Sequence, residues 1–234
     1  VSYNAYPHWM DKQAVVHHLA GLLKPEGRFL VAHGMSRAAL NDHHGNVPED
    51  VTSDLMPVRI AAKPWTDCFD IDQLCDADHC FYFGGRLNAA ERAFQATRRK
   101  AIADVAAGTY ACVFIQDGQI THAAEGAGIG PVLRMFDAGA LKDAYVVDKI
   151  IGKAAAMMMH LGGAVGGHGV VVSDTAVAWC RQSGMFMDWT TRSESIINRM
   201  GTGLCPMEQT VCDMTDEQQA YAALKAKLEE LRSQ

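Results

Sequence analysis

The sequence predicts an α/β protein with a parallel β-sheet in its second half. The prediction rests on two strand-then-helix units in series, residues 145–161 and 168–184. The first helix, expected over residues 149–161, is apolar almost all round and therefore belongs inside a domain. Two such units in series imply neighbouring parallel strands joined by crossover helices.

Polar side chains follow both predicted strands at the point where each strand ends. Asp148 and Lys149 follow the first strand, and we expect Asp148 to cap the next helix; Ser173 and Asp174 follow the second strand and open its helix. Ligands of parallel sheets gather at the carboxyl ends of the strands. Lys153, one helical turn beyond Lys149, adds a second cation for a phosphate group. The alternative is that Lys153 faces solvent.

Cys205 is the most reactive candidate in the chain. It precedes Pro206 and Glu208 in the pattern of a helix start, with Glu208 where a capping-box acid is found. A thiol at a helix N-terminus is favoured as the thiolate, so Cys205 is a candidate nucleophile with Asp148 and Lys149 as catalytic partners. The alternative is a structural cysteine in a glycine turn that leads into a capped helix.

The residues before Cys205 suggest a ligand loop. Gly201 and Gly203 let the backbone approach a ligand closely. Asn198 and Arg199 are expected to help bind it. The alternative is that Asn198 and Arg199 brace the glycine loop.

Length, charge and cysteine content limit the possible classes of protein. A chain of 234 residues, 49% of them hydrophobic, suits two domains with separate cores. A net charge of -6 does not favour binding to duplex nucleic acid. We expect neither a signal peptide nor a membrane span, because the sequence shows no pattern of the first and no apolar run long enough for the second. Seven cysteines without framework spacing predict reduced thiols and a cytoplasmic protein.

The first half predicts part of an open α/β sheet. The chain starts at Val1 inside a strand-like run, so we expect sequence to precede it in the intact protein. Asp11 and Ser36 are expected helix caps, and the acidic stretch 72–78 is expected to be a turn. In order, we expect a helix at 12–23, a strand at 28–33, a helix at 36–41, and strands at 66–71 and 80–83.

Three motifs in this half carry a family resemblance. Residues 3–9 read Tyr-Asn-Ala-Tyr-Pro-His-Trp, residues 23–33 read Leu-Lys-Pro-Glu-Gly-Arg-Phe-Leu-Val-Ala-His, and a Ser-Arg…Leu-Asn-Asp-His-His run follows. Residues 1 to about 88 thereby resemble the C-terminal half of class I S-adenosylmethionine-dependent methyltransferases. The resemblance implies a partial Rossmann-like sheet, in which the first motif follows strand four, the second introduces strand five, and strands six and seven form a closing hairpin.

The resemblance implies a methyl-acceptor side formed by Asn4, Tyr6, His8 and His33, with His8 able to act as a general base. The alternative is that Asn4 and Pro7 shape a loop while Tyr6 and Trp9 pack. The glycine-rich loop and ribose-binding acid of the family have no counterpart here. We therefore expect S-adenosylmethionine to bind only to a longer chain.

The histidine pairs and cysteines of this half do not predict a metal site. Adjacent histidines on a helix point about 100° apart, so neither His17-His18 nor His43-His44 chelates as it stands. Cys68, Cys75 and Cys80 lack Cys-x-x-Cys spacing and are expected to be packed thiols.

The second domain is expected to begin near residue 95, inside a locally basic helix. Asp117-Gly118 is a strong hairpin turn, Ser193 or Ser195 is expected to start a short helix, and Thr215 to cap the last helix. The remaining expected elements are a helix at 88–106, strands at 109–115 and 119–123, a helix at 131–138 and a strand at 185–189.

Residues 97–234 resemble the DUF1893 family of bacteria and archaea. The motifs are Asp117-Gly118, Gly128-Ile129-x-Pro131, the run 147–155, Ser173-Asp174 and the run 198–208. The resemblance implies a cytidine-deaminase-like α/β/α sandwich without an established reaction.

A zinc deaminase site is not encoded in these motifs. Such sites need His-x-Glu and Pro-Cys-x-x-Cys, but the chain has Asp148-Lys149-Ile150 and Ser173-Asp174-Thr175 instead. The glycine run 126–131 also lacks the spacing of a dinucleotide turn.

The sequence thus predicts a methyltransferase sheet fragment at 1–95 and a deaminase-like domain at 96–234. We expect the second domain to bind a small nucleotide-like or anionic ligand, with no duplex nucleic acid or membrane as partner. The alternative is a non-catalytic ligand-sensing or interaction module. The exposed edge of a truncated sheet favours a homodimer.

Overall fold

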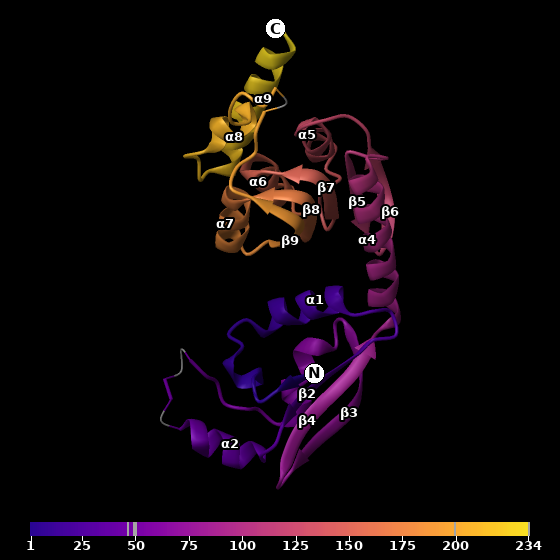
Figure 1. Cartoon of the computed structure of the whole chain (residues 1–234), viewed down its shortest axis with the longest axis vertical. Coiled ribbons are helices and arrows are strands. Elements are labelled where there is room, and N and C mark those ends of the chain that lie inside the picture. The colour runs from indigo at the N-terminus through magenta and orange to yellow at the C-terminus, as the bar shows by residue number, and fades with distance from the viewer. Residues whose placement is uncertain (46, 49–50, 199, 234) are drawn as a thin grey trace. The chain divides into compact units, whose positions relative to one another are not determined.

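A computed structural model describes residues 1–45, 47–48, 51–198 and 200–233 of the chain (Figure 1). The chain divides into two compact units, Val1–Ala96 and Thr97–Gln234. Both units combine a mixed β-sheet with helices, so the predicted α/β class is confirmed.

The first unit is built on a four-stranded sheet with the order β1-β2-β4-β3. Strands β1 and β2 pair in parallel, whereas β4 is antiparallel to both β2 and β3. The strands are β1 (Ser2–Tyr3), β2 (Arg28–His33), β3 (Phe69–Ala77) and β4 (Cys80–Leu87).

Helices and aromatic side chains complete the first unit. Asp11 and Ser36 cap α1 and α2 by accepting hydrogen bonds from Ala14 N and Ala39 N, as predicted. Phe29 and Trp65 stack in the core with ring centroids 4.1 Å apart. The helical segments are η1 (Tyr6–His8), α1 (Lys12–Leu22), α2 (Arg37–His44), α3 (Val58–Ala61) and η2 (Lys63–Trp65).

The acidic stretch 72–78 is a strand as far as Ala77, and only Asp78 lies in the predicted turn. Strand β3 runs to Ala77, and Ala77 pairs directly with Cys80 of β4. The stretch tolerates its charges because β3 is an edge strand whose acids lie near cations: Asp72 pairs with Arg28, and Asp76 pairs with Arg37. Local composition indicated a turn, but cross-strand pairing decides the structure.

Helix α4 (Ala89–Ala107) starts in the first unit and ends in the second. Asn88 caps it by accepting a hydrogen bond from Glu91 N. Gly108 ends it with a φ of +83°, a conformation that favours glycine.

The second unit contains a five-stranded sheet with the order β6-β5-β7-β8-β9. Strands β7, β8 and β9 are parallel, which confirms the predicted parallel sheet, and β5 pairs antiparallel with β6 and β7. The strands are β5 (Cys112–Gln116), β6 (Gln119–Ala124), β7 (Tyr145–Ile151), β8 (Gly166–Ser173) and β9 (Phe186–Ser193).

One face of this sheet carries the main core. Helix α6 lies in this core, and its Met157, Met158 and Met159 are all fully buried, as its apolar sequence predicted. A Cβ at Gly167 of β8 would lie 2.6 Å from Met159 Cε, so the close approach of helix and sheet depends on glycine. The helices are α5 (Gly130–Asp137), α6 (Lys153–Leu161), α7 (Asp174–Ser183), α8 (Pro206–Val211) and α9 (Glu217–Arg232).

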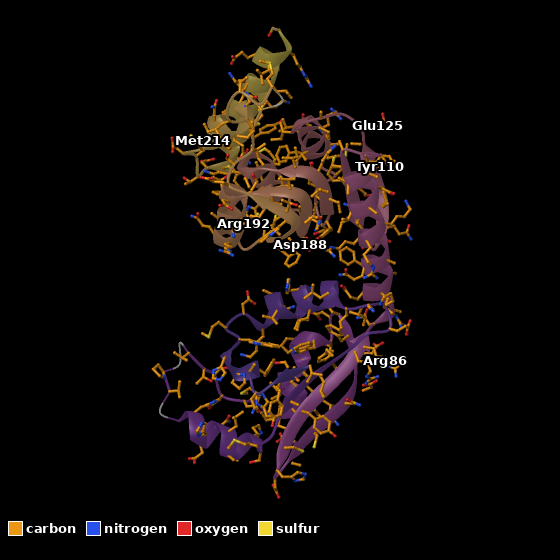
Figure 2. The ribbon with its side chains drawn as sticks, viewed as in Figure 1. Arg86, Tyr110, Glu125, Asp188, Arg192 and Met214 are labelled. Atoms are coloured by element: carbon orange, nitrogen blue, oxygen red, sulfur yellow. The ribbon has the colours of Figure 1, made fainter. Side chains whose placement is uncertain are left out.

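A buried polar network lies where α4 meets strands β7 to β9. Asp188, labelled in Figure 2, forms an ion pair with Arg98 of α4 and accepts a hydrogen bond from Tyr145 Oη at 3.1 Å. His168 Nδ1 lies 2.8 Å from Asp188 Oδ1, and His168 Nε2 lies 3.0 Å from Thr190 Oγ1. The network holds the middle of α4, at Arg98, on the sheet.

Three predicted local features of this unit are wrong. Strand β7 continues through Asp148 and Lys149 to Ile151, so these residues belong to a strand and not to a helix. The helix expected at 193 or 195 does not form, because β9 pairs with β8 as far as Ser193. Asp216, rather than Thr215, caps α9 by accepting from Gln219 N.

Candidate functional site

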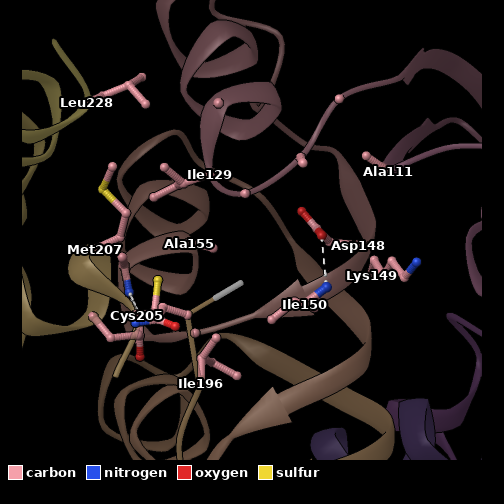
Figure 3. Close-up of a pocket in the computed structure, with 18 of the residues that line it drawn as sticks. Ala111, Ile129, Asp148, Lys149, Ile150, Ala155, Ile196, Cys205, Met207 and Leu228 are labelled. Atoms are coloured by element: carbon pink, nitrogen blue, oxygen red, sulfur yellow. Dashed lines mark hydrogen bonds between the residues drawn. The ribbon is translucent and has the colours of Figure 1, made fainter. Parts of the chain in front are cut away.

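A cavity of about 870 Å³ opens at the carboxyl end of β7 (Figure 3). Its wall comes from β7, from the loop before α5, from the segment that leads into α8, and from the end of α9. The volume lies within the range of small-molecule sites in proteins. All three predicted catalytic residues, Asp148, Lys149 and Cys205, line this one cavity.

Asp148 is the buried acid of the cavity. It is 7% exposed, and its Oδ1 accepts a hydrogen bond from Ile150 N at 3.0 Å, drawn as a dashed line in Figure 3. Burial raises the pKa of this carboxyl to about 7, against the lowering effect of the Ile150 and Lys149 amides. A carboxyl group with such a pKa can both donate and accept a proton at neutral pH.

Cys205 is half-buried on the opposite wall and occupies the N-cap position of α8, as predicted. Its side chain makes no capping hydrogen bond. Because α8 has only 6 residues, fewer aligned peptide dipoles face the sulfur than in a long helix. Position in the cavity therefore supports a role for Cys205 better than the helix dipole does.

Glu208 does not cap its own helix as predicted. Its carboxylate reaches the N-terminus of α6, where Oε2 accepts from Lys153 N at 2.9 Å and Oε1 accepts from Ala154 N at 3.0 Å. Thr175 Oγ1 of α7 donates to the same carboxylate at 3.2 Å. Glycine at position 152 leaves the space, since a Cβ there would lie 2.3 Å from Glu208 Oε1. One carboxylate thus joins α6, α7 and α8.

The Glu208→Ala substitution is expected to lower the free energy of unfolding of the second unit by about 2 kcal/mol, because two amides of α6 lose a charged acceptor. Glu229→Ala, which removes an exposed acid from α9, is the matched control. Urea unfolding of both variants measures the difference. Equal stability of the two variants would show that the α6 cap contributes nothing.

The loop before Cys205 is braced by its own asparagine. Asn198 lines the cavity, but its Oδ1 accepts from Met200 N and Thr202 N, both at 3.1 Å. Asn198 therefore braces the loop, as in the alternative, and its ligand-binding role stays a prediction. Gly201, with a φ of +69°, and Gly203 lie outside the cavity wall. Arg199 lies outside the described residues.

Three other predicted ligand-binding residues contact protein groups outside the cavity. Lys153 Nζ donates to Cys212 O at 2.8 Å and lies over the Trp179 ring. Ser173 is fully buried and accepts a hydrogen bond from Ala176 N, as its predicted capping role requires. Asp174 pairs with Arg192.

The predicted spacing of Lys149 and Lys153 on one helix is wrong because Lys149 lies on β7. Lys149 is exposed at the cavity, whereas Lys153 is half-buried beside α7. The two cations therefore do not form the phosphate-binding pair expected from a shared helix face.

The sequence did not predict that the glycine loop before α5 would form part of the site. Residues 126–130 line the cavity, with φ values of +116° at Gly126 and +68° at Gly128. Its sequence lacks the spacing of a dinucleotide turn, and its Gly128-Ile129-x-Pro131 motif indicated the family rather than a site. The available signal was the closely spaced glycines next to Pro131, which allow a tight backbone turn at a helix start.

The predicted methyl-acceptor residues of the first unit have different environments. Asn4 has a φ of +54° and its Oδ1 accepts from Gly34 N at 3.3 Å. Tyr6 is buried and donates to Ala61 O at 2.7 Å, so it packs as in the alternative. His8 is exposed, whereas His33 is 2% exposed and neither ring nitrogen has a hydrogen-bond partner among the described residues.

The described residues contain neither a metal-ligand cluster nor a helix suited to span a membrane. No three His, Cys, Asp or Glu side chains among them are gathered as ligands around a metal ion. None of their helices combines the length and apolar character of a membrane span.

A family profile and a solved structure are similar to this chain. The profile of the family described as TM1506, Domain of unknown function (DUF1893), matches residues 100–228. The crystal structure of the DUF1893 family protein TM1506 from Thermotoga maritima is similar, with a TM-score of 0.51 and 21% identity over 56% of this chain and 90% of that chain. A comparison with curated proteins finds no match. The structural likeness indicates a shared fold.

Proposed function

The chain belongs to the DUF1893 family through residues 100–228, and on this premise we propose that its second unit binds a small nucleobase-like molecule in the cavity at the end of β7. The observation that carries the proposal is a buried carboxyl group, Asp148, in a cavity of about 870 Å³. Small-molecule sites combine apolar walls with a few placed polar groups in this manner.

The lining favours a flat heterocycle. Ile129, Ala155 and Met207 supply apolar surface for the faces of a ring (Figure 3). The Asp148 carboxyl can pair with a ring edge that carries both a donor and an acceptor, because it is itself able to do both near neutral pH. An anionic group beside Asp148 would meet a like charge, so we place any phosphate of a nucleotide toward the exposed Lys149.

In its catalytic form, the proposal gives Asp148 the role of general acid or base and Cys205 the role of nucleophile. The strand order of the unit, with β7, β8 and β9 parallel and helices between them, supports the cytidine-deaminase-like sandwich. The zinc deaminases carry their metal-binding motifs at helix starts. In this chain the Glu208 carboxylate bonds the starts of α6 and α7 instead, which supports a site without zinc.

A binding module without chemistry is the second candidate. The α6 amides, which could otherwise stabilise an oxyanion, already donate to Glu208. In that candidate Asp148 recognises the ligand and Cys205 remains unreactive.

For the first unit we propose the C-terminal half of a methyltransferase sheet. A parallel pair β1-β2 followed by the antiparallel hairpin β3-β4 agrees with the strand sequence that the resemblance implies. The test compares S-adenosylmethionine affinity of this chain with that of a chain extended upstream. Tight binding by the shorter chain would contradict the proposal.

Site-resolved alkylation tests the second unit. We expect cytidine or adenosine to slow the reaction of Cys205 with iodoacetamide several-fold, measured by peptide mass spectrometry at neutral pH. Cys212 is the internal control, because it is exposed and lies outside the cavity wall. Fast, nucleoside-protected alkylation favours catalysis.

An inert Cys205 favours the binding module, and nucleoside binding is then measured by calorimetry with Asp148→Asn as the comparison. Absence of binding by either nucleoside in both experiments would refute the proposed function.

A further inference from the structure

Two cysteines contact each other across the β3–β4 hairpin of the first unit. Cys75 lies two residues before the end of β3, and Cys80 is the first residue of β4. Their Sγ atoms are 3.7 Å apart, at the distance of a weak hydrogen bond between thiols. Both residues are half-buried, so part of each remains open to solvent.

The register of the hairpin explains this contact. Cys75 pairs with Tyr82 of β4, which lies two residues beyond Cys80. Side chains two residues apart on a strand point to the same face, so Cys75 and Cys80 share one face of the sheet as diagonal neighbours. A turn of two residues joins the strands beside them. The backbone pairing of the hairpin therefore holds the two sulfurs together.

The two thiols influence each other's ionisation. The hydrogen bond to Cys75 is the largest of the causes that raise the pKa of Cys80, followed by burial and by the negative charge of Cys75. One sulfur of the pair can therefore be ionised while the other keeps its proton. An attacking cysteine beside a resolving cysteine has this arrangement.

Other cysteines of the chain have different environments. Cys68, Cys112 and Cys180 are buried, and burial raises the pKa of each, which disfavours the reactive thiolate. Cys212 is exposed, and its thiol donates to the carboxylate of Asp213 at 3.3 Å. Cys212 therefore provides an accessible thiol for comparison within the same chain.

We propose that Cys75 and Cys80 form a redox-active dithiol that small-molecule disulfides convert into an intramolecular disulfide. With oxidised glutathione, one cysteine thiolate attacks a glutathione sulfur, forms a mixed disulfide and releases one glutathione thiolate. The other cysteine then attacks the cysteine sulfur of the mixed disulfide and releases the second glutathione. The chain loses two hydrogen atoms, and the oxidised glutathione is reduced to two thiols.

The second step is favoured because it occurs within the hairpin. A resolving sulfur that is already in contact with its target acts at a high effective concentration. The sulfurs must approach from 3.7 Å to covalent distance, which rotation of the two side chains can supply next to the turn. In a reducing compartment a pair of this kind rests as two thiols and is oxidised transiently.

Reaction of the full chain with a fixed ratio of oxidised to reduced glutathione tests the pair. Remaining thiols are blocked with N-ethylmaleimide, and a protease that cuts at aspartate then cleaves the chain at Asp76 or Asp78. After this cleavage, peptides with Cys75 and Cys80 stay joined only through a disulfide. By mass spectrometry we expect at least tenfold more disulfide than glutathione adduct at these two positions, whereas Cys212 carries the adduct.

Serine variants separate the two steps. Cys75→Ser and Cys80→Ser should each abolish the joined peptides and leave a stable glutathione adduct on the remaining cysteine of the pair. Cys212→Ser, which removes an exposed thiol from the second unit, is the matched control and should leave the joined peptides unchanged. Circular dichroism checks that each variant is folded.

Two results with the unsubstituted chain would overturn the inference. One is an adduct on Cys212 without joined peptides from Cys75 and Cys80 under the same conditions. The other is a disulfide that links these cysteines only to a second chain or to Cys68. The experiment does not involve the cavity of the second unit, so it is independent of the proposed nucleobase site.

Discussion

At pH 8, the Asp148→Asn substitution is expected to raise the free energy of unfolding of the second unit by about 4 kcal/mol. Burial raises the pKa of Asp148 to about 7 in the folded chain, whereas an aspartate in the unfolded chain titrates near 3.9. Between these values the folded carboxyl keeps a proton that the unfolded chain has released. The stability that the unsubstituted chain owes to a protonated Asp148 is therefore fully present below about pH 4, and it is lost as the pH rises through about 7.

The magnitude follows from about three pH units at about 1.4 kcal/mol each. The Asp148→Asn variant has no carboxyl group that can ionise, so its free energy of unfolding does not fall in this pH range. Its side-chain amide oxygen can still accept a hydrogen bond from the Ile150 amide. Urea unfolding at pH 5 and pH 8 measures the effect, which should shrink toward the lower pH. Asp213→Asn, an exposed position in the same unit, is the control. Destabilisation by Asp148→Asn at pH 8 would contradict the buried-acid description.

A residue that costs stability at neutral pH requires a reason for its presence. Natural sequences retain such residues where binding or catalysis depends on them. If Asp148→Asn gains stability and loses nucleoside affinity together, the carboxyl belongs to the binding site. If it gains stability and keeps its affinity, recognition depends on other groups of the cavity.

The Asp188→Ala substitution is expected to lower the free energy of unfolding of the second unit by about 3–5 kcal/mol. Arg98 is 7% exposed and loses its carboxylate partner in this variant, which is the costly way to break a buried ion pair. His168 and Tyr145 lose the same acceptor. Asp174→Ala is the control. It breaks the ion pair of Asp174 with Arg192, which is more exposed than the Arg98–Asp188 pair, and should change the free energy of unfolding by less than about 1 kcal/mol.

The effect of Asp188 should depend on pH in the opposite sense to that of Asp148. Burial raises the pKa of Asp188, but the hydrogen bond from His168 and the charge of Arg98 lower it by more, so the folded pKa lies below the usual value. The stabilisation is present above about pH 3.9 and is lost as the pH falls through the folded pKa. Equal loss in Asp188→Ala and Asp174→Ala at pH 7 would refute the structural role.

The elements that the sequence predicted best are those with local boundaries. Strand β2 has the predicted limits, Arg28 and His33, because a Lys-Pro-Glu-Gly turn precedes an apolar run. Helix α1 begins after Asp11, whose side chain supplies the cap. The apolar composition of residues 154–159 also predicted correctly that α6 would be buried.

The errors concern partners that are distant in the sequence. Asp148 resembled a helix cap, but β7 continues because Ile151 pairs with Val172 of β8. Glu208 stands in a local capping box, yet its carboxylate bonds amides that lie 54 and 55 residues away.

The segment before and within α8 serves both the cavity and the core. Cys205, Pro206, Met207 and Glu208 all line the cavity, and Glu208 also accepts hydrogen bonds from the first amides of α6. A molecule that shifts this segment must therefore alter how often the Lys153 and Ala154 amides open to solvent. Hydrogen–deuterium exchange at these two positions is a reporter of occupancy that needs neither a reaction product nor a labelled ligand.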